Sequence, residues 1–245
     1  MFHTIFYEPV YNLLVIFLQV VPQHDIGVSI ILMTILVKTI LLPLNLSAMK
    51  SQYVMKSIEG ELKDLREKYK NEPQISSQKM MEIYKREKIN PFASLFVVLL
   101  QIPIFIALYL VFSKGMHLDI NSLYSFVHFP ELLHTEAFGI LDVTKRSLVV
   151  AILTGISSYI LARRQTVSMR SDKKPHEETF QDHFMKSMRM QLLYVLPVII
   201  GFSAYVLPGA LGVYWITNNV LSYLQDIYIK HHLSKKVLSK IVVVN

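Results

Sequence analysis

Long apolar blocks separated by charged segments dominate this sequence. A helix that spans a bilayer needs about 20 mostly apolar residues, and five blocks reach or approach that length. The third and fourth blocks are short and contain polar residues, so hydropathy alone leaves them ambiguous. The pattern predicts an all-α, polytopic membrane protein with five transmembrane helices, at residues 26–46, 91–113, 146–163, 191–207 and 210–229.

Residues 1–25 form a sixth apolar stretch, which Glu8, Pro9 and Asn12 interrupt. The stretch lacks the basic start that is typical of a signal peptide. It therefore predicts an interfacial helix that lies on the outer leaflet. The alternative is an additional, uncleaved span, which would conflict with the distribution of charge along the rest of the chain.

Basic residues are concentrated in three of the segments that connect or follow the apolar blocks. Residues 47–90 contain 10 Lys and Arg, residues 163–190 contain 7, and residues 230–245 contain 4, together 21 of the 25 in the chain. Five spans would place these three segments on one side of the membrane, and the excess of Lys and Arg marks that side as cytoplasmic. The charge pattern thus predicts an extracytoplasmic N-terminus and loop 114–145, with loop 164–190 and the basic tail 230–245 in the cytoplasm.

Residues 47–90 contain a second helical pattern, amphipathic and rich in Lys and Glu. An apolar stripe with spacings of three and four residues predicts one helix, and the segment Asn71-Glu72-Pro73 ends it. Ser76 or Ser77 is expected to cap a second helix. The segment therefore predicts a cytoplasmic helical hairpin that contacts lipid headgroups and proteins, although a solvated connector is the plainer alternative. The apolar stripe consists of Met55, Ile58, Leu62, Leu65 and Tyr69.

Lys38 lies within the first apolar block and is the most informative residue of the chain. A charge at the centre of a spanning helix costs about 2.5–3.5 kcal/mol on insertion scales, so such residues usually serve a function. At about 100° per residue, Thr34 and Asn45 share a helix face with Lys38. Pro43 removes one backbone hydrogen bond and is expected to kink the helix. The alternative for Lys38 is that its ammonium merely extends to cytoplasmic water.

Two other predicted spans also have a polar face. Ser94 and Gln101 share one side of the second span, where Pro103 is expected to produce another kink. Because polar groups that face lipid would be poorly satisfied, these faces are expected to turn toward one another around a hydrated groove. Ordinary hydrogen bonding between helices is the alternative for Gln101 and for the pair Asn218 and Asn219, and simple packing is the alternative for Trp215. The polar stripe of the fifth span is Leu211, Trp215, Asn218, Ser222 and Gln225.

Composition and motifs exclude several kinds of chemistry for this chain. The chain is 52% hydrophobic and 18% charged and contains no cysteine, which excludes disulfides, thiolate metal sites and cysteine catalysis. No nucleophile and base, phosphate-binding glycine loop or metal-ligand cluster occurs at a recognised spacing. We therefore expect no enzyme activity, no metal, no cofactor and no recognition of a specific nucleic acid sequence.

Four segments, in this order, resemble the YidC insertases, which are related to the mitochondrial oxidase-assembly and chloroplast Albino proteins. The resemblance implies a monomeric core of five helices with a groove open to the cytoplasm and to lipid. In that family a basic residue on the first span, usually arginine, lies in the groove, and Lys38 corresponds to it. The segments are YEPVYNLL, VKTILLPLNLSAMKSQ, NPFASLFVVLLQIPIFIALYLVF and LPGALGVYWITNNVLSYLQ.

The function implied by the resemblance is insertion of nascent membrane proteins into the lipid bilayer of a bacterial plasma membrane. The groove would shorten the dry path of a polar tail, the hairpin would capture or admit substrates, and the apolar segment would partition into lipid. A ribosome and a secretion channel are candidate partners. Two other classes stay open, an assembly factor that holds membrane helices without inserting them and a small transporter.

Overall fold

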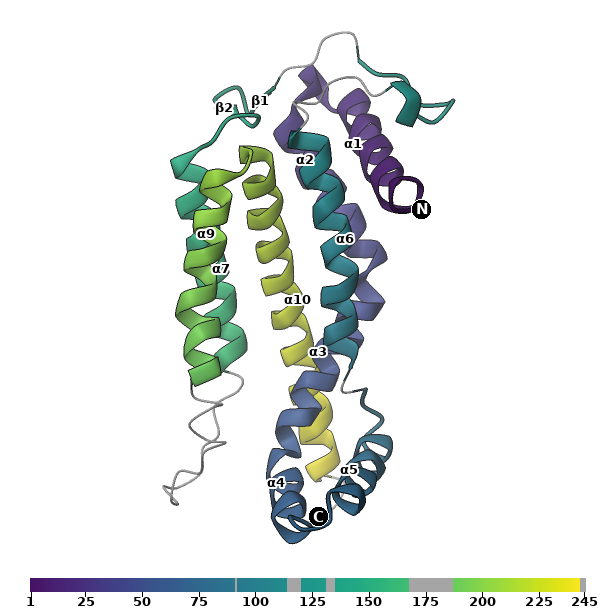
Figure 1. Ribbon diagram of the computed structural model, residues 1–245, viewed down its shortest axis with the longest axis vertical. Coiled ribbons are helices and arrows are strands. Elements are labelled where there is room, and N and C mark those ends of the chain that lie inside the picture. The colour runs from purple at the N-terminus through teal and green to yellow at the C-terminus, as the bar shows by residue number, and fades with distance from the viewer. Residues whose placement is uncertain (91, 114–119, 131–134, 168–186, 243–245) are drawn as a thin grey trace. The chain divides into compact units, whose positions relative to one another are not determined.

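A computed structural model of the protein describes residues 1–90, 92–113, 120–130, 135–167 and 187–242. The described chain is mostly helical, as the sequence predicts. It divides into two compact units, one formed by Met1–Ile40 and Gln101–Tyr223 and the other by Leu41–Leu100 and Leu224–Asn245. Figure 1 labels the elements used below.

The first unit begins with a helical N-terminal segment that packs on the helix containing Lys38. In order, its helices are η1 (His3–Tyr7), α1 (Glu8–Val20), η2 (Pro22–His24) and α2 (Ile26–Ile40). Tyr11, Leu14 and Leu18 are fully buried and recur at spacings of three and four, which gives α1 one apolar face. That face lies against α2, whose Ile26 and Ile30 are equally buried.

The remaining helices of this unit are α6 from Gln101 onward, η3, α7, η4, α9 and the first part of α10. The tightest pair is α7 with α9, in which two glycines, Gly155 and Gly201, face each other. A Cβ on Gly201 would lie 3.2 Å from the Cα of Gly155, so the glycines allow the two backbones to approach closely. The full bounds are α6 (Ala93–Ser113), η3 (Ile120–Ser122), α7 (Leu148–Val167), η4 (Gln191–Val195), α9 (Leu196–Val206) and α10 (Gly209–Val242).

A short antiparallel pair of strands corrects the all-α expectation. The strand β1 (Glu136–Ala137) pairs with β2 (Leu141–Asp142). Three residues, 138–140, connect the strands, and the backbone N–H of Ile140 donates to the carbonyl of Ala137 at 3.2 Å. The two central residues of this turn, Phe138 (φ 57°) and Gly139 (φ 68°), both lie in the left-handed region, as in a type I′ turn. Strands of two residues are too short to show a period-2 pattern, so the sequence could not reveal them.

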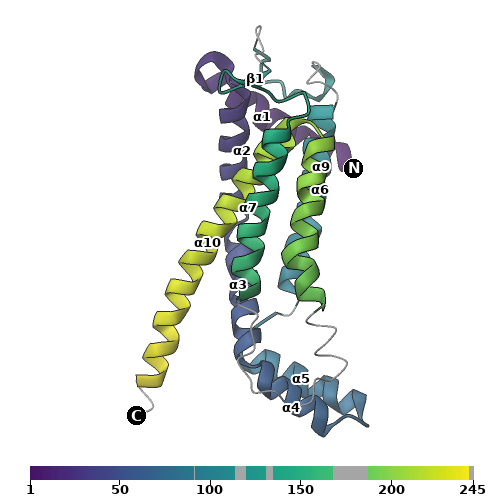
Figure 2. The ribbon, with the colours of Figure 1, turned by 90° about the vertical axis from the view of Figure 1, so that its left-hand side faces the viewer.

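The second unit contains α3 (Leu42–Ser57), α4 (Glu59–Lys68) and α5 (Pro73–Arg86), together with the start of α6 and the end of α10. Helices α4 and α5 lie side by side (Figure 2). A cluster of apolar side chains holds them together, and the Arg86 guanidinium donates to both Glu61 carboxylate oxygens at 3.0 and 2.6 Å. The cluster contains buried Ile58, Leu62, Ile83 and Ile89, with Val54, Met55, Leu65, Met80 and Tyr84 around it.

Two details of the expected hairpin are wrong. The apolar stripe does not lie on a single helix, because the chain breaks at Ile58, whose φ of −101° and ψ of 4° are not helical. Neither serine caps the second helix, because α5 already begins at Pro73, a residue that favours the first turn. Ser77 instead donates its hydroxyl to the carbonyl of Pro73, at 2.9 Å.

Length and composition identify two described helical segments that could cross a membrane, Leu95–Ser113 and Ser187–Val206. Helices Ile26–Ile40 and Leu42–Met55 pass the same test together and would give a third span, broken at Leu41. The other two expected spans, α7 and α10, contain arginines or several amides that lower their mean hydropathy. Loop 164–190 lies mostly outside the described residues.

Candidate functional site

Lys38 extends from α2 to α10. Its ammonium donates a hydrogen bond to the Ser222 hydroxyl, with 2.8 Å between Nζ and Oγ. Thr34, one turn earlier on α2, is buried and donates its hydroxyl to the carbonyl of Ile30 at 2.6 Å. The structure thus brings Lys38 and Ser222 together from opposite ends of the sequence, whereas the hydroxyl proton of Thr34 is engaged within its own helix.

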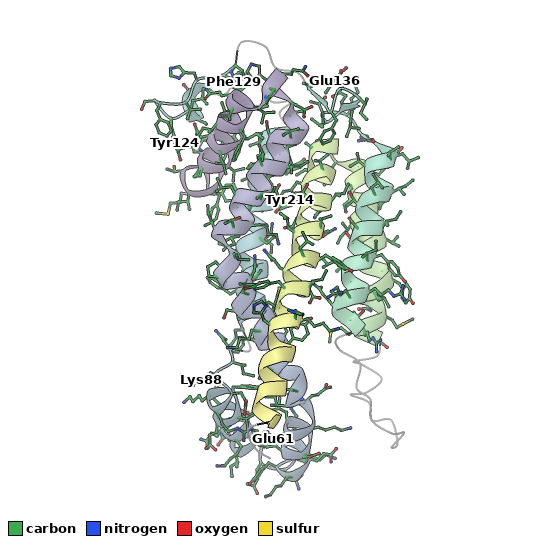
Figure 3. The ribbon with its side chains drawn as sticks, turned by 180° about the vertical axis from the view of Figure 1, so that it is seen from behind. Glu61, Lys88, Tyr124, Phe129, Glu136 and Tyr214 are labelled. Carbon is green, nitrogen blue, oxygen red and sulfur yellow. The ribbon has the colours of Figure 1, made fainter. Side chains whose placement is uncertain are left out.

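A second pair of contacts joins α6 to α10. The Gln101 amide donates to the hydroxyl of Tyr214, a buried residue labelled in Figure 3. One helical turn further along α6, the ring of Phe105 stacks on Trp215, with 4.9 Å between ring centroids. Pro103 lies between the two contacts, inside α6, where it provides no backbone N–H.

Hydroxyl groups of α7 form a third set of contacts with α10, which the sequence analysis did not identify. The Asn219 amide donates to Ser157 at 3.1 Å and to Ser158 at 2.9 Å, and Thr154 donates to the carbonyl of Gly212 at 3.4 Å. The spacing of three and four residues between Thr154 and the serines was the available signal, because it places them on one helix face.

Asn218, beside this set, has a different environment. Its side-chain oxygen is shielded from solvent and accepts no hydrogen bond within the described part of the chain. Shielded polar atoms without a partner are uncommon in proteins, and they often belong to sites with a function. Asn218 is therefore a predicted groove residue whose side-chain oxygen is buried and has no partner among the described residues.

Three predicted site residues, Asn45, Ser94 and Pro43, belong to the second unit. Asn45 is buried in α3, and Pro43 is the second residue of that helix, just after the break at Leu41. Ser94 lies in α6, and its side chain is outside the described residues. Their expected place beside Lys38 stays a prediction.

The same unit contains a buried acid that the sequence analysis missed. Asp226 of α10 is 3% exposed, and it accepts a hydrogen bond of 2.6 Å from the Tyr53 hydroxyl of α3. An acidic residue near the end of an apolar stretch was the available signal. The bond joins α3 to α10 within this unit.

The five residues predicted to recruit substrates are mostly engaged in contacts between helices. Ile58 and Leu62 are buried, while Met55 and Leu65 pack against them. Tyr69 ends α4, and the Lys68 ammonium lies 5.5 Å from the centre of its ring. The apolar groups that α5 exposes are others, Ile75 and Met81, at 40% and 45% exposure.

Several ionisable groups outside the apolar helices are paired. Hydrogen bonds from Arg86 lower the pKa of Glu61, and the carboxylates of Glu61 and Glu87 raise the pKa of Arg86. Hydrogen bonds from Thr144 and Lys145 lower the pKa of Asp142 to about 2. Among the described ranges, no three His, Asp or Glu side chains lie close enough to hold a metal ion.

Ammonium, hydroxyl and amide groups that meet among apolar helices define a helical membrane protein with a polar interior. The family is more specific: residues 16–236 match the 60Kd inner membrane protein family, and the chain belongs to it. The resemblance to YidC insertases is thereby confirmed, because the similar proteins are named membrane protein insertase YidC.

These relatives differ in length. The Oceanobacillus iheyensis protein is 28% identical over 241 residues, which cover 96% of this chain and 85% of that protein. The Psychromonas ingrahamii and Shewanella woodyi proteins are 32% and 30% identical over 94% and 93% of this chain. The chain spans only 36% and 37% of those two proteins.

Proposed function

We propose that this protein is a membrane protein insertase. It admits the polar tail of an incoming membrane protein to a hydrated groove between α2, α6 and α10, and it releases the apolar segment into lipid. The observation that carries the proposal is the contact between Lys38 and Ser222 among apolar helices, in a chain whose relatives are named insertases. Nothing in this function makes or breaks a covalent bond.

The physical task is to lower the barrier for a polar tail that must cross about 30 Å of hydrocarbon. An ammonium in a medium of low polarity attracts carboxylates more strongly than it would in water. Because it has three N–H donors, Lys38 can hold Ser222 and still receive a carboxylate of the tail. The acceptor of Asn218 can receive an N–H of the same tail.

Release requires that these contacts stay weak. Lysine presents a rotating point charge and lacks the planar fork with which arginine binds a carboxylate through two hydrogen bonds. A single ammonium contact is therefore easier for a passing tail to leave. Burial of the apolar segment in lipid then drives the process forward.

We place five spans in the membrane of a bacterial cell, with the N-terminus outside and the C-terminus in the cytoplasm. The distribution of basic residues supports this orientation, because 21 of the 25 lie in segments that five spans put on one side. In this arrangement α1 lies at the outer surface, and α4 and α5 form a cytoplasmic hairpin. The exposed Ile75 and Met81 of α5 are the hairpin groups that remain available to substrates.

The partners that follow are nascent membrane proteins and the lipid bilayer, with a ribosome and a secretion channel as further candidates. The protein acts as a monomer without a cofactor. Charge complementarity selects among substrates, so acidic tails are preferred over basic tails at equal length.

Reconstitution in liposomes tests the proposal. The substrate is a single-span protein with a short acidic N-terminal tail, and its insertion is measured as protection of the tail from protease. We expect the native chain and Lys38→Arg to insert it and Lys38→Ala to insert it slowly. Arg146→Ala is the matched control, because it removes a positive charge from an exposed residue of the outer loop.

Three results would redirect the proposal. Full insertion by a folded Lys38→Ala protein would remove Lys38 from the mechanism. A native chain that binds membrane helices stably and inserts none would be an assembly factor. Flux of a solute across the liposome membrane without insertion would indicate a transporter.

A further inference from the structure

The turn between β1 and β2 is docked on the first turn of α2. The carboxylate of Asp25 accepts a hydrogen bond from the backbone N–H of Val28 at 2.9 Å, which caps α2. Its other oxygen accepts the backbone N–H of Phe138 at 2.6 Å. One side chain therefore both begins α2 and holds the strand turn against it.

Gly27 has no side chain, which leaves room for the turn to pack against α2. A Cβ on Gly27 would lie 2.6 Å from the Cβ of Ala137 and 2.9 Å from the ring of Phe138, far inside ordinary carbon contact. Ala137 is completely buried. Phe138 has a φ of 57°, which is strained for a bulky residue and persists only where surrounding contacts enforce it.

The chain that leaves the turn is fixed to the beginning of α10. The backbone N–H groups of Gly209 and Ala210 donate to the carbonyls of Lys145 and Val143, at 3.0 and 2.9 Å. These are N–H groups that a helix start leaves unpaired, so the loop satisfies them. In Figure 3 the labelled Glu136 of β1 lies at the same end of this unit as the beginning of α10.

We propose that residues 136–145, with Asp25 and Gly27, form an outer latch that fixes the spacing of α2 and α10 and so positions Lys38 opposite Ser222. Gly27 lies about 16 Å from Lys38 along α2, and Gly209 lies about 20 Å from Ser222 along α10. The latch and the polar contact thus join the same two helices at two levels. Asp25 and Gly27 are positioning residues, and the consequence for insertion rests on the proposed function.

The first test measures the spacing itself and needs no activity. The chain contains no cysteine, so two introduced cysteines at Ile40 and Val220, which are 65% and 50% exposed, can receive spin labels in the membrane-reconstituted protein. We expect Gly27→Ala to broaden the distance distribution or shift it by about 1 Å or more, because ordinary carbon contact is about 3.5–4.0 Å. Adding Ala137→Gly removes the atom nearest to the new methyl group, so we expect the distribution to move part of the way back to the native one, since the Phe138 ring at 2.9 Å remains.

Two further variants make this measurement decisive. Asp25→Ala removes both acceptors without adding volume, and it should broaden the distribution even if Gly27→Ala fails to fold. Gly155→Ala is the matched control, because its Cβ would lie 3.6 Å from the nearest atom, an ordinary contact. A native distance distribution in a folded Asp25→Ala protein would overturn the latch. A native distance distribution in the Gly27→Ala single variant, without Ala137→Gly, would also overturn it.

The second test asks whether the latch acts through Lys38 and Ser222. Insertion rates are compared for Gly27→Ala, Ser222→Ala and the double variant. If the latch works through this contact, the double variant is no slower than the slower single variant. The positioning role would be refuted if the fold-reductions in insertion rate of the two single variants multiply in the double variant. A native chain without insertion would defeat the proposed function, while the distance measurement would still decide the latch.

Discussion

Replacing Lys38 by methionine should make the protein more stable and less active. Methionine has a similar length and no charge. An ammonium at the centre of a spanning helix costs about 2.5–3.5 kcal/mol, and a hydrogen bond to a charged group returns about 1.5–3 kcal/mol. The net effect of the ammonium therefore ranges from a stabilisation of about 0.5 kcal/mol to a destabilisation of about 2 kcal/mol. We expect Lys38→Met to raise the free energy of unfolding by about 1 kcal/mol.

The opposite sign is expected when the partner is removed instead. Ser222→Ala keeps the ammonium and deletes the hydroxyl that accepts its hydrogen bond. An ammonium that loses its partner should lower the free energy of unfolding by about 1–3 kcal/mol. Comparing the two variants distinguishes the cost of the buried charge from the contribution of its hydrogen bond to the free energy of unfolding.

Both quantities can be measured on the same preparations. Unfolding in mixed micelles, followed by circular dichroism against denaturant, gives the free energies, and insertion of an acidic-tailed substrate into liposomes gives the activity. A Lys38→Met protein whose free energy of unfolding is lower than that of the native chain by more than about 0.5 kcal/mol would refute the reasoning, because Lys38 would then be a structural bond between helices. Native insertion by the same variant would refute its role in the groove.

Three further predictions concern the helix contacts and the outer turn. Asn219→Leu should lower the free energy of unfolding by about 0.6–1.7 kcal/mol, the range for hydrogen bonds between helices in membranes, as measured by denaturant unfolding. Gly212→Ala should destabilise by about 1–3 kcal/mol, since its Cβ would lie 2.2 Å from a valine methyl group, whereas Gly155→Ala should be neutral or stabilising in the same measurement. The pKa of Asp142 is lowered from 3.8 to about 2, so its contribution to stability is complete above pH 3.8 and is lost as the pH falls toward 2. The melting temperatures of the native chain and Asp142→Asn should therefore differ at pH 6 and converge near pH 2.

Helical periodicity in the sequence was enough to choose the polar faces of the spans. It placed Lys38 on a polar face of one helix and Ser222 on a polar face of another. Periodicity states which residues share a face, but it does not state which helix that face meets. For that reason the partner of Gln101, the Tyr214 hydroxyl, and the α7 serines that bind Asn219 were not predicted.

The breaks in the helices and the outer turn were harder to predict for a local reason. At Ile58 the apolar spacing continues without interruption while the backbone leaves the helix, so the pattern gave no sign of the break. Pro43 suggested a kink, but the helix ends at Ile40, three residues earlier, because a proline fits the first turn of a new helix. At Phe138 a bulky residue has a positive φ, which sequence rules assign to glycine or asparagine.

Two kinds of helix contact in the first unit have different consequences for a substrate. Between α7 and α9, Gly155 and Gly201 bring backbone against backbone, and no side chain of an incoming protein could replace that contact. Between α2, α6 and α10, Lys38 and Gln101 each make one side-chain hydrogen bond within the described part of the chain. Each such bond contributes a net of only about 0.5–3 kcal/mol, so a polar tail that offers equivalent partners can exchange with it. Under the proposed function, we therefore expect the helices that contain Lys38 and Gln101 to separate for a substrate and the glycine-paired helices to stay together.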